Sequence, residues 1–241
     1  NFTLLNTEPS RFSDDSIARL RRITNVFEHE CDRNFLIDNI HKFNAIFIGL
    51  KNVIDKEILD NSSKLECIIT PTTGLNHIDI HEANRKNIVI LSLKDELDFL
   101  KTLTSTAELT WALLLNLIRN IYQAHKSVVN KKWDRDRFKG KELKELTLGI
   151  IGYGRLGSMV ASYGSAFGMN IIVNDISLNS NCPYDYVNLD ELLTTSDVIT
   201  IHVPMNDDTK LLLNKKNLYK LKHGAILINT SRGEIIDEDI I

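Results

Sequence analysis

The fold is decided by the stretch Thr147–Gly157, which reads TLGIIGYGRLG. Its first five residues are mostly apolar, as in a buried strand, and its last six have the glycine spacing G-x-G-x-x-G. A helical pattern follows, and the next predicted strand, Asn170–Asn174, ends beside an acidic residue, Asp175, 18 positions after Gly157. This order of strand, glycine turn, helix, strand and acid is typical of a dinucleotide-binding unit.

Each residue of the turn has a mechanical role in such a unit. Gly152 permits the tight turn, Gly154 lets the backbone approach a pyrophosphate, and Gly157 lets the helix pack close to the strand. The amides of Arg155 and Leu156 would point at phosphate from the helix N-terminus. The turn therefore predicts a phosphate-binding site.

The acid Asp175 indicates which cofactor the site takes. Its carboxylate can accept hydrogen bonds from both hydroxyls of an adenosine ribose and would repel a 2′-phosphate. No arginine follows it, since the next residues are Ile176 and Ser177. The sequence therefore favours NAD over NADP. A glycine turn in an α/β protein without a cofactor is the alternative, and the acid at this spacing argues against it.

The rest of the chain alternates short β-branched runs with helical patterns, which is typical of an α/β fold with parallel sheets. We expect two domains, residues 1–100 and residues 101–241, the second a doubly wound parallel sheet. A single long helix is predicted over residues 104–129. The strands expected in the first domain are 2–5, 25–28, 45–49, 67–70 and 89–92, and its expected helices are 14–22, 34–41, 55–61 and 79–86.

Two further segments follow predicted strands of the second domain. They are His202-Val203-Pro204 and Thr230-Ser231-Arg232. In a doubly wound sheet the carboxyl ends of the strands line the ligand crevice, so both segments should lie beside the cofactor. The planar guanidinium of Arg232 suits a carboxylate, which it can hold with two hydrogen bonds.

These motifs together resemble the D-isomer-specific 2-hydroxyacid dehydrogenases. Two more segments contribute to the resemblance: Thr72–Asp79 is similar to the family's substrate loop, and Ser105–Glu108 is similar to the segment that opens its long helix. The resemblance implies a flavodoxin-like substrate domain followed by an NAD-binding Rossmann domain. It also implies that Thr73 and Gly74 hold the substrate carboxylate and that Thr106 lies near the nicotinamide.

The resemblance implies the chemistry as well. Hydride would pass between a small D-2-hydroxy or 2-keto acid and NAD, with Arg232 binding the carboxylate and polarising the carbonyl. His202, Val203, Pro204 and the pair Thr230 and Ser231 would contact the cofactor. The family's catalytic Glu and His would lie beyond Ile241, so we expect the C-terminal part of the Rossmann domain to be missing from this sequence. His202 precedes Arg232 and is therefore assigned to the cofactor rather than to acid–base catalysis.

The family precedent suggests a homodimer. It also leaves a second hypothesis open, because the family contains corepressors that bind NAD and regulate assembly without turnover. The two hypotheses differ in whether the protein oxidises NADH.

Composition excludes several other classes. The 241 residues carry a formal net charge of -3, so no basic excess favours nucleic acid, and no apolar run approaches the ~20 residues of a membrane span. The three cysteines show no metal or disulfide spacing, which favours a reducing, cytoplasmic location. His77 and His81 could share a helix face as metal ligands, but no third ligand is evident and no metal is predicted.

Overall fold

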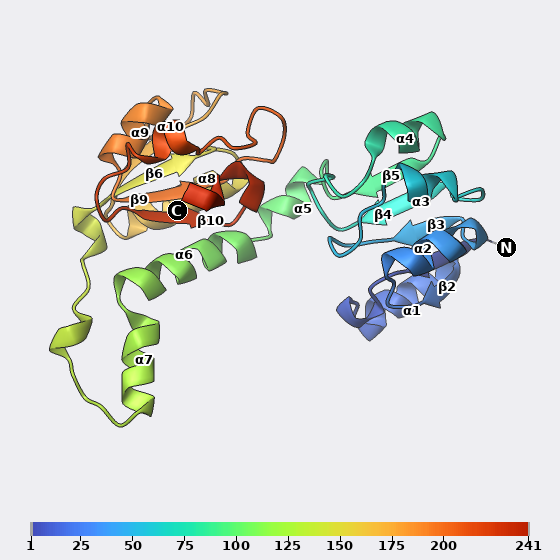
Figure 1. Ribbon diagram of the computed structural model, residues 1–241, viewed down its shortest axis with the longest axis horizontal. Coiled ribbons are helices and arrows are strands. Elements are labelled where there is room, and N and C mark those ends of the chain that lie inside the picture. Colours follow the sequence, from blue (N-terminus) through green and yellow to red (C-terminus); the bar gives the residue numbers. More distant parts are fainter. Residues whose placement is uncertain (1, 241) are drawn as a thin grey trace. The chain divides into compact units, whose positions relative to one another are not determined.

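The computed structural model describes residues 2–240, and Figure 1 shows their helices and strands. The chain divides into two compact units, residues 1–100 and residues 101–241. Each unit contains one five-stranded sheet.

The sheet of the first unit is parallel, with the strand order β2-β1-β3-β4-β5. This is the flavodoxin-like order, and it confirms the predicted fold of this part. The middle of the sheet is fully buried, since Leu5, Ile46 and Ile68 are 0% exposed. The strands are β1 (Thr3–Asn6), β2 (Asn25–Glu28), β3 (Ala45–Phe47), β4 (Cys67–Thr70) and β5 (Val89–Ser92).

Helices connect these strands, and four of them begin at a side-chain cap. The capping residues are Ser13, Asp32, Asp55 and Asp79, whose side chains each accept a hydrogen bond from a first-turn amide. The α-helices are α1 (Asp14–Ile23), α2 (Arg33–Asn39), α3 (Lys56–Asp60), α4 (Ile80–Arg85) and α5 (Leu97–Lys101), with 3-10 turns at Pro9–Arg11 and Ile40–Lys42.

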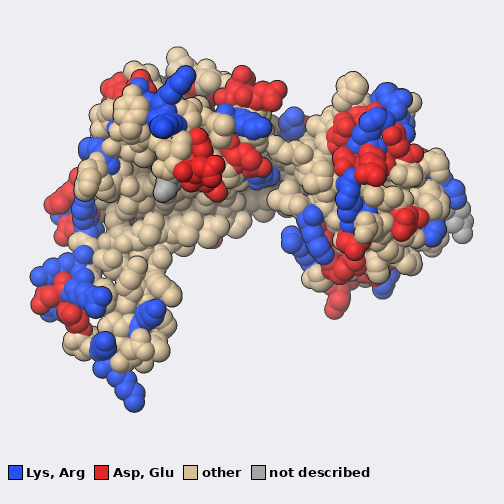
Figure 2. Space-filling view, in the orientation of Figure 1, with Lys and Arg blue, Asp and Glu red and all other residues tan. Residues whose placement is uncertain are grey.

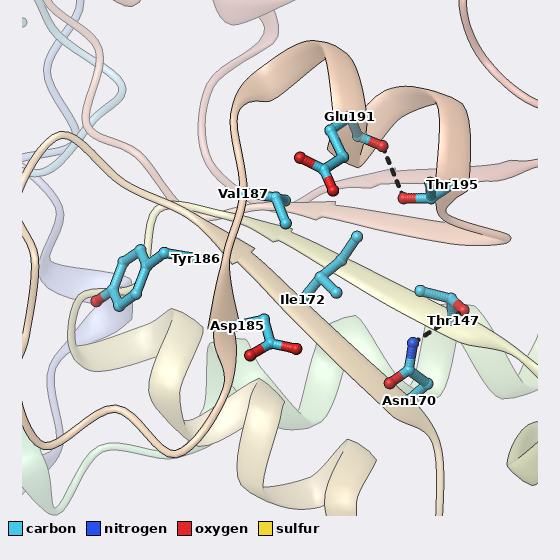
Figure 3. Close-up of a pocket in the computed structure, with 8 residues that line it drawn as sticks. All are labelled: Thr147, Asn170, Ile172, Asp185, Tyr186, Val187, Glu191 and Thr195. Carbon is cyan, nitrogen blue, oxygen red and sulfur yellow. Dashed lines mark hydrogen bonds between the residues drawn. The ribbon is translucent and has the colours of Figure 1, made fainter.

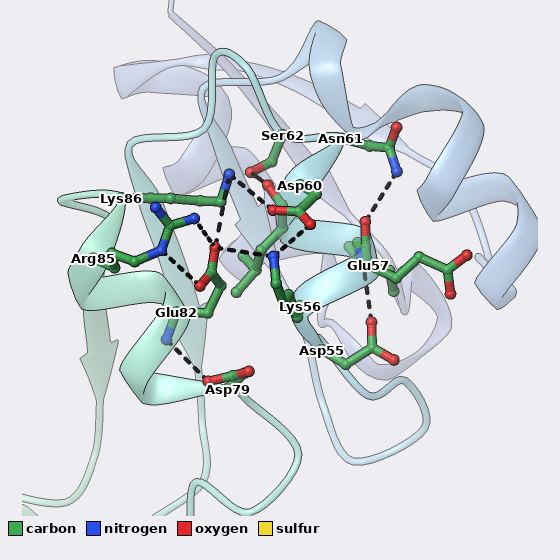
Figure 4. A network of polar contacts seen from close by, with 12 residues as sticks. Asp55, Lys56, Glu57, Asp60, Asn61, Ser62, Asp79, Glu82, Arg85 and Lys86 are labelled. Carbon is green, nitrogen blue, oxygen red and sulfur yellow. Dashed lines mark hydrogen bonds and ion pairs between the residues drawn. The ribbon is translucent and has the colours of Figure 1, made fainter.

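A network of charges joins α3 to α4 (Figure 4). Its centre is Glu82, which is only 4% exposed and accepts hydrogen bonds from Arg85 Nε at 2.8 Å and Arg85 Nη2 at 2.5 Å. Lys56 and Lys86 each lie 3.9 Å from Glu82 and also bind Asp60, at 2.7 and 3.3 Å. On the face of this unit visible in Figure 2, acidic and basic side chains are correspondingly interspersed. The network fixes the position of α4 against α3, and it thereby also fixes the end of the loop that precedes α4.

The sheet of the second unit is also parallel, with the order β10-β9-β6-β7-β8. Its strands are β6 (Thr147–Ile151), β7 (Asn170–Asn174), β8 (Asp185–Tyr186), β9 (Val198–Ile201) and β10 (Ile226–Asn229). Its helices are α6 (Ser105–Ile118), α7 (Ile121–Val129), α8 (Arg155–Ala166), α9 (Leu189–Thr195) and α10 (Lys215–Leu218), with 3-10 turns at Asp136–Phe138, Leu143–Glu145, Gly233–Ile235 and Glu238–Ile240.

Helices cover both faces of this sheet (Figure 1). On one face Trp111 of α6 and Val160 of α8 pack in a core with Ile150 of β6. On the other face Leu192 of α9 packs in a separate core with Ile199 of β9. The predicted doubly wound architecture is confirmed.

The single helix predicted over residues 104–129 is wrong. Helix α6 ends at Ile118, and α7 starts at Ile121 in a new direction. Between them Asn120 adopts a left-handed conformation with φ 53°, which asparagine tolerates better than most residues. The amide of Tyr122 then bonds to the side chain of Asn116 at 3.0 Å. Helical periodicity continued through this break, so the pattern alone did not reveal it.

No helix among residues 2–240 combines the length and the apolar character that crossing a bilayer requires.

The network around Glu82 makes a testable contribution to stability. Hydrogen bonding to Arg85 lowers the pKa of Glu82, so its stabilisation is present above the unfolded-state pKa of about 4.3 and is lost as the pH falls through the lowered folded-state pKa. We expect Glu82→Gln to lower the midpoint of thermal unfolding at pH 7, and the difference from the native chain to shrink below about pH 4.

Glu57→Gln is the matched control. Glu57 pairs with Arg33, but 64% of its side chain is exposed, so its loss should shift the midpoint less. A midpoint difference for Glu82→Gln that did not change with pH would contradict the role of its charge.

Candidate functional site

The candidate site lies where the strand order of the second sheet reverses. From β6 the chain proceeds to β7 and β8 on one side and then to β9 and β10 on the other. The carboxyl ends of β6, β9 and β10 lead into the glycine turn, into His202–Pro204 and into Thr230–Arg232 respectively. In open α/β sheets this switch point is where ligands bind. The structure thus brings three of the predicted segments to one edge.

Gly152 makes the turn that the sequence predicted. Its φ is 92°, which favours glycine, and its amide donates to Asn174 O at 2.8 Å. A Cβ at this position would lie 2.8 Å from the carbonyl carbon of His202 and 2.8 Å from Val203 Cγ1. The turn is therefore packed against the end of β9, with no room for a side chain.

The other two glycines of the motif differ in what surrounds them. A Cβ on Gly157 would lie 2.0 Å from the carbonyl oxygen of Gly152, so helix α8 could not pack on the turn with any side chain there. A Cβ on Gly154 would meet nothing within 4 Å. Gly157 is thus required by the fold, whereas the space above Gly154 is open, as the approach of a pyrophosphate would need.

The N-terminus of α8 supplies donors at this opening. The amide of Ser158 makes the first bond of the helix, to Gly154 O at 2.9 Å, so the amide of Leu156 points outward from the helix start. Arg155 reaches away from the turn, and its Nη1 donates to Leu103 O at 3.0 Å. The backbone at Arg155 and Leu156, rather than the Arg155 guanidinium, therefore faces the predicted phosphate position.

Asp175 has a second role that the sequence did not reveal. Its Oδ2 accepts from the amide of Tyr153 at 2.7 Å, and its Oδ1 accepts from the amide of Ser177 at 2.8 Å. The acid therefore organises the glycine turn as well as standing at the end of β7. A carboxylate has about four lone-pair positions, so it can still accept hydrogen bonds from ribose hydroxyls.

His202 is a neutral group in this site. Burial lowers its pKa to about 4, and its ring nitrogens are buried without a hydrogen-bond partner among the described residues. Its backbone amide donates to Ile151 O at 2.7 Å and so ties β9 to β6. Beyond it Val203 packs on the core, and Pro204 O accepts from Thr209 Oγ1 at 2.6 Å. An uncharged imidazole fits the predicted cofactor contact better than proton donation at neutral pH.

Side chains around Arg232 fix its backbone. Asn229 Nδ2 donates to Arg232 O at 2.7 Å, and Ser231 Oγ donates to Ile201 O at 2.9 Å. The guanidinium is half-buried, and its Nη1 donates to Ser231 O at 3.1 Å. It lines a cavity of about 590 Å³ together with Asn229, Ser231, Gly233, Ile236 and Glu238.

A hydroxyl pair links Thr106 and its helix to the same strand end. Thr110 Oγ1 lies 2.9 Å from Thr230 Oγ1 and donates to Thr106 O at 2.9 Å. Thr106 itself is half-buried in the first turn of α6. Sequence reasoning selected Thr106 and Thr230 but missed Thr110, since a threonine inside a helix carries no distinctive signal.

The predicted substrate loop belongs to the first unit, where it follows the carboxyl end of β4. Thr73 is exposed and Gly74 is half-buried. The loop is shaped by hydroxyls: Thr72 Oγ1 donates to Gly74 O at 2.8 Å and lies 3.0 Å from Thr70 Oγ1.

The histidine pair considered as metal ligands does not share a helix face. His77 is buried in the loop, with Nε2 3.3 Å from Thr70 Oγ1, whereas His81 lies on α4. Within residues 2–240 no group of three or more His, Cys, Asp or Glu side chains could hold a metal ion.

A second cavity of the second unit lies at the opposite edge of the sheet (Figure 3). Its volume is about 490 Å³, and it lies beside Thr147 and Asn170, the first residues of β6 and β7. Asn170 Nδ2 donates to Thr147 Oγ1 at 3.3 Å across its floor. It is therefore remote from the glycine turn and is not the cofactor site.

Comparison with known families identifies both parts of the chain. Residues 111–241 match the family model described as D-isomer specific 2-hydroxyacid dehydrogenase, NAD binding domain. Residues 5–112 match the model of the catalytic domain of the same family.

Individual relatives include hydroxypyruvate reductase of Thermotoga maritima, 33% identical over 90% of this chain and 69% of the relative. D-3-phosphoglycerate dehydrogenase of Bacillus subtilis is 35% identical over 83% of this chain but only 38% of the relative. The crystal structure of D-lactate dehydrogenase from Aquifex aeolicus, complexed with NAD and lactic acid, superposes with a TM-score of 0.88 at 30% identity and covers 98% of this chain and 71% of that one. The chain therefore spans between about a third and about two thirds of the length of these two curated relatives.

Because the space above Gly154 is open and Gly157 is crowded, alanine should have different effects at the two positions, on NADH binding at Gly154 and on stability at Gly157. We expect Gly154→Ala to leave the thermal midpoint of the chain within about 2 °C, because its Cβ meets nothing, but to weaken NADH binding at least tenfold by occupying the pyrophosphate position. We expect Gly157→Ala to lower the midpoint by several degrees, because its Cβ must displace backbone.

The measurements are thermal unfolding followed by circular dichroism and titration of NADH fluorescence. Unaltered NADH affinity in Gly154→Ala would show that the cofactor does not approach the backbone there.

Proposed function

Because this chain belongs to the D-isomer-specific 2-hydroxyacid dehydrogenase family, we propose that it carries the NAD site and part of the substrate site of an oxidoreductase acting on small D-2-hydroxy or 2-keto acids. The observation that carries the proposal is the convergence of the glycine turn and Arg232 at one sheet edge. Since the chain spans only part of its relatives, the proposed activity is that of the whole protein.

Different residues at the carboxyl ends of the second sheet's strands would bind different parts of the cofactor. The turn Gly152–Gly157 would hold the pyrophosphate, and Asp175 would hold the adenosine ribose. His202–Pro204, Thr230 and Ser231 would line the path toward the nicotinamide, with Thr106 at its end. NAD supplies the acceptor or donor of hydride in this reaction.

Arg232 would act on the substrate. Its guanidinium can hold the substrate carboxylate with two hydrogen bonds and stabilise the negative charge that develops on the carbonyl oxygen during ketone reduction. Within the first unit, the backbone amides of Thr73 and Gly74 would be available to bind a carboxylate. Since Asn229 and Ser231 already fix the backbone at Arg232, the guanidinium is presented from a rigid strand end.

The test is oxidation of NADH by the full-length protein with a panel of 2-keto acids, including glyoxylate, pyruvate and hydroxypyruvate. We expect turnover with at least one of them and a loss of about 100-fold or more in kcat/KM for Arg232→Ala. Arg232→Lys keeps the charge but not the planar fork, so it should recover only part of the activity.

Binding of NADH without turnover of any 2-keto acid would contradict the dehydrogenase proposal and favour the regulatory hypothesis. Unchanged kcat/KM in Arg232→Ala would contradict the role of Arg232.

We propose that the second unit forms a homodimer through α6 and α7. The side chains of Leu109, Leu113 and Leu117, spaced four apart on α6, are 40–53% exposed, and Ile121 at the start of α7 is 51% exposed. Such a continuous apolar stripe on a helix is typical of an interface. The α7 helix and the loop after it extend from the body of this unit (Figure 1).

Dimerisation can be tested with a charge in the stripe. We expect Leu113→Lys to shift the mass measured by light scattering from dimer to monomer. Ile23→Lys is the matched control, since Ile23 is 80% exposed on α1 and should leave the mass unchanged. A monomeric native protein would contradict the proposal.

We also place the protein in the cytoplasm. The support is its three free cysteines, one of them, Cys31, buried, with burial raising the pKa of its thiol to about 12. Cysteines that form no disulfide fit a reducing compartment.

A further inference from the structure

The second residue of the glycine motif, Tyr153, connects two parts of the cofactor edge. Its backbone amide donates to Asp175 Oδ2 at 2.7 Å. Its side chain packs edge-on against two other tyrosines, with ring centroids 6.0 Å from Tyr184 and 6.2 Å from Tyr186 and interplanar angles of 85° and 84°. The backbone and the side chain of Tyr153 therefore both make specific contacts, although the motif allows any residue at this position.

The segment 176–186 beyond Asp175 needs such an anchor, because burial does not hold it. Ile176 is 103% exposed and Leu178 is 78% exposed. The amide of Ser177 nevertheless donates to Asp175 Oδ1 at 2.8 Å, so the position of this exposed segment determines the contact at the second oxygen of Asp175.

The tyrosines hold the segment at its middle and its end. Tyr186 Oη accepts from the amide of Asn179 at 3.0 Å, and Asn179 O accepts from the amide of Cys182 at 3.0 Å. Cys182 Sγ donates to Tyr184 O at 3.5 Å.

We propose that Tyr153 is a positioning residue for cofactor choice: its amide and its ring together hold both oxygens of Asp175 in the orientation that accepts the two ribose hydroxyls and rejects a 2′-phosphate. The amide acts on Oδ2 directly. The ring acts on Oδ1 through Tyr184, Tyr186 and the segment that carries Ser177. This inference rests on the proposed NAD site.

The contribution of the Tyr153 ring can be tested separately from that of its backbone amide. Tyr153→Ala removes the packing surface of the segment and keeps the backbone amide. NADH loses hydrogen bonds when Asp175 turns, whereas NADPH does not make them, so the ratio of the two dissociation constants should change.

We expect Tyr153→Ala to raise the dissociation constant of NADH about tenfold, with that of NADPH unchanged or lowered, which reduces the discrimination by at least that factor. Tyr153→Phe keeps the ring and should retain discrimination within about twofold. Tyr163→Ala is the matched control, because Tyr163 packs on the same core from α8 and should leave the ratio unchanged. Asp175→Asn should give the largest loss of discrimination between NADH and NADPH, since it removes the charge that repels the 2′-phosphate.

The experiment is titration of the intact chain with NADH and NADPH by fluorescence, accompanied by hydrogen exchange of residues 176–187. Faster exchange of this segment in Tyr153→Ala, together with reduced discrimination, supports the proposal. Should Tyr153→Ala fail to fold, Tyr186→Phe replaces it, because this variant removes only the acceptor for Asn179 and should reduce discrimination about two- to threefold.

An unchanged NADH-to-NADPH ratio in the folded Tyr153→Ala chain, or in Tyr186→Phe where that variant replaces it, would overturn the inference while leaving the NAD site intact. A native chain that binds no NADH would instead overturn the proposed function on which the inference rests.

Discussion

The close approach of helix α8 to the turn before it is the constraint on which the cofactor edge depends. A Cβ at Gly157 would stand 2.0 Å from the carbonyl oxygen of Gly152, and a Cβ at Gly152 would stand 2.8 Å from the backbone of His202. Because the opposing atoms are backbone in both cases, no rotamer change can relieve them. The turn, the helix start and the end of β9 therefore form one packed unit, and the position of each fixes the others.

Hydrogen bonds from side chains extend this unit across the edge. Ser231 binds the carbonyl of Ile201 at the end of β9, and Thr230 meets Thr110 of α6. Each contact joins residues that are far apart in the sequence but adjacent at the carboxyl ends of parallel strands. A ligand at this edge would meet groups held in place before it binds, which reduces the entropy that binding must overcome.

Much of this arrangement could be predicted from the sequence, because local patterns determine it. The glycine spacing, the acid after β7 and the apolar strands all act over a few residues, and the strands of both sheets other than β8 followed from them. The break at Asn120 could not be predicted, since the helical pattern continues on both sides of one left-handed residue. The short strand β8 was missed because two residues, Asp185 and Tyr186, carry no periodicity.

The other features that the sequence did not predict depend on contacts between residues that are distant in the chain. Thr110 and Tyr153 gain their importance from partners that only the fold brings near, Thr230 in one case and two tyrosines in the other. A one-dimensional pattern records that a position is polar or aromatic but not what it faces. The role of Asp175 in holding the turn was hidden for the same reason, since the motif names the acid only as a ribose ligand.

The two hydrogen bonds of Asp175 also bear on how a carboxylate can discriminate between cofactors. An exposed and freely rotating carboxylate could turn away from a 2′-phosphate and recover much of its hydration, so charge alone would give limited selectivity. Here the amides of Tyr153 and Ser177 occupy one position on each oxygen and oppose that rotation. The remaining lone pairs keep fixed directions, which suits two vicinal hydroxyls and leaves a phosphate facing a charge that cannot move aside. Selectivity at this edge therefore depends on the rigidity of the carboxylate as much as on its charge.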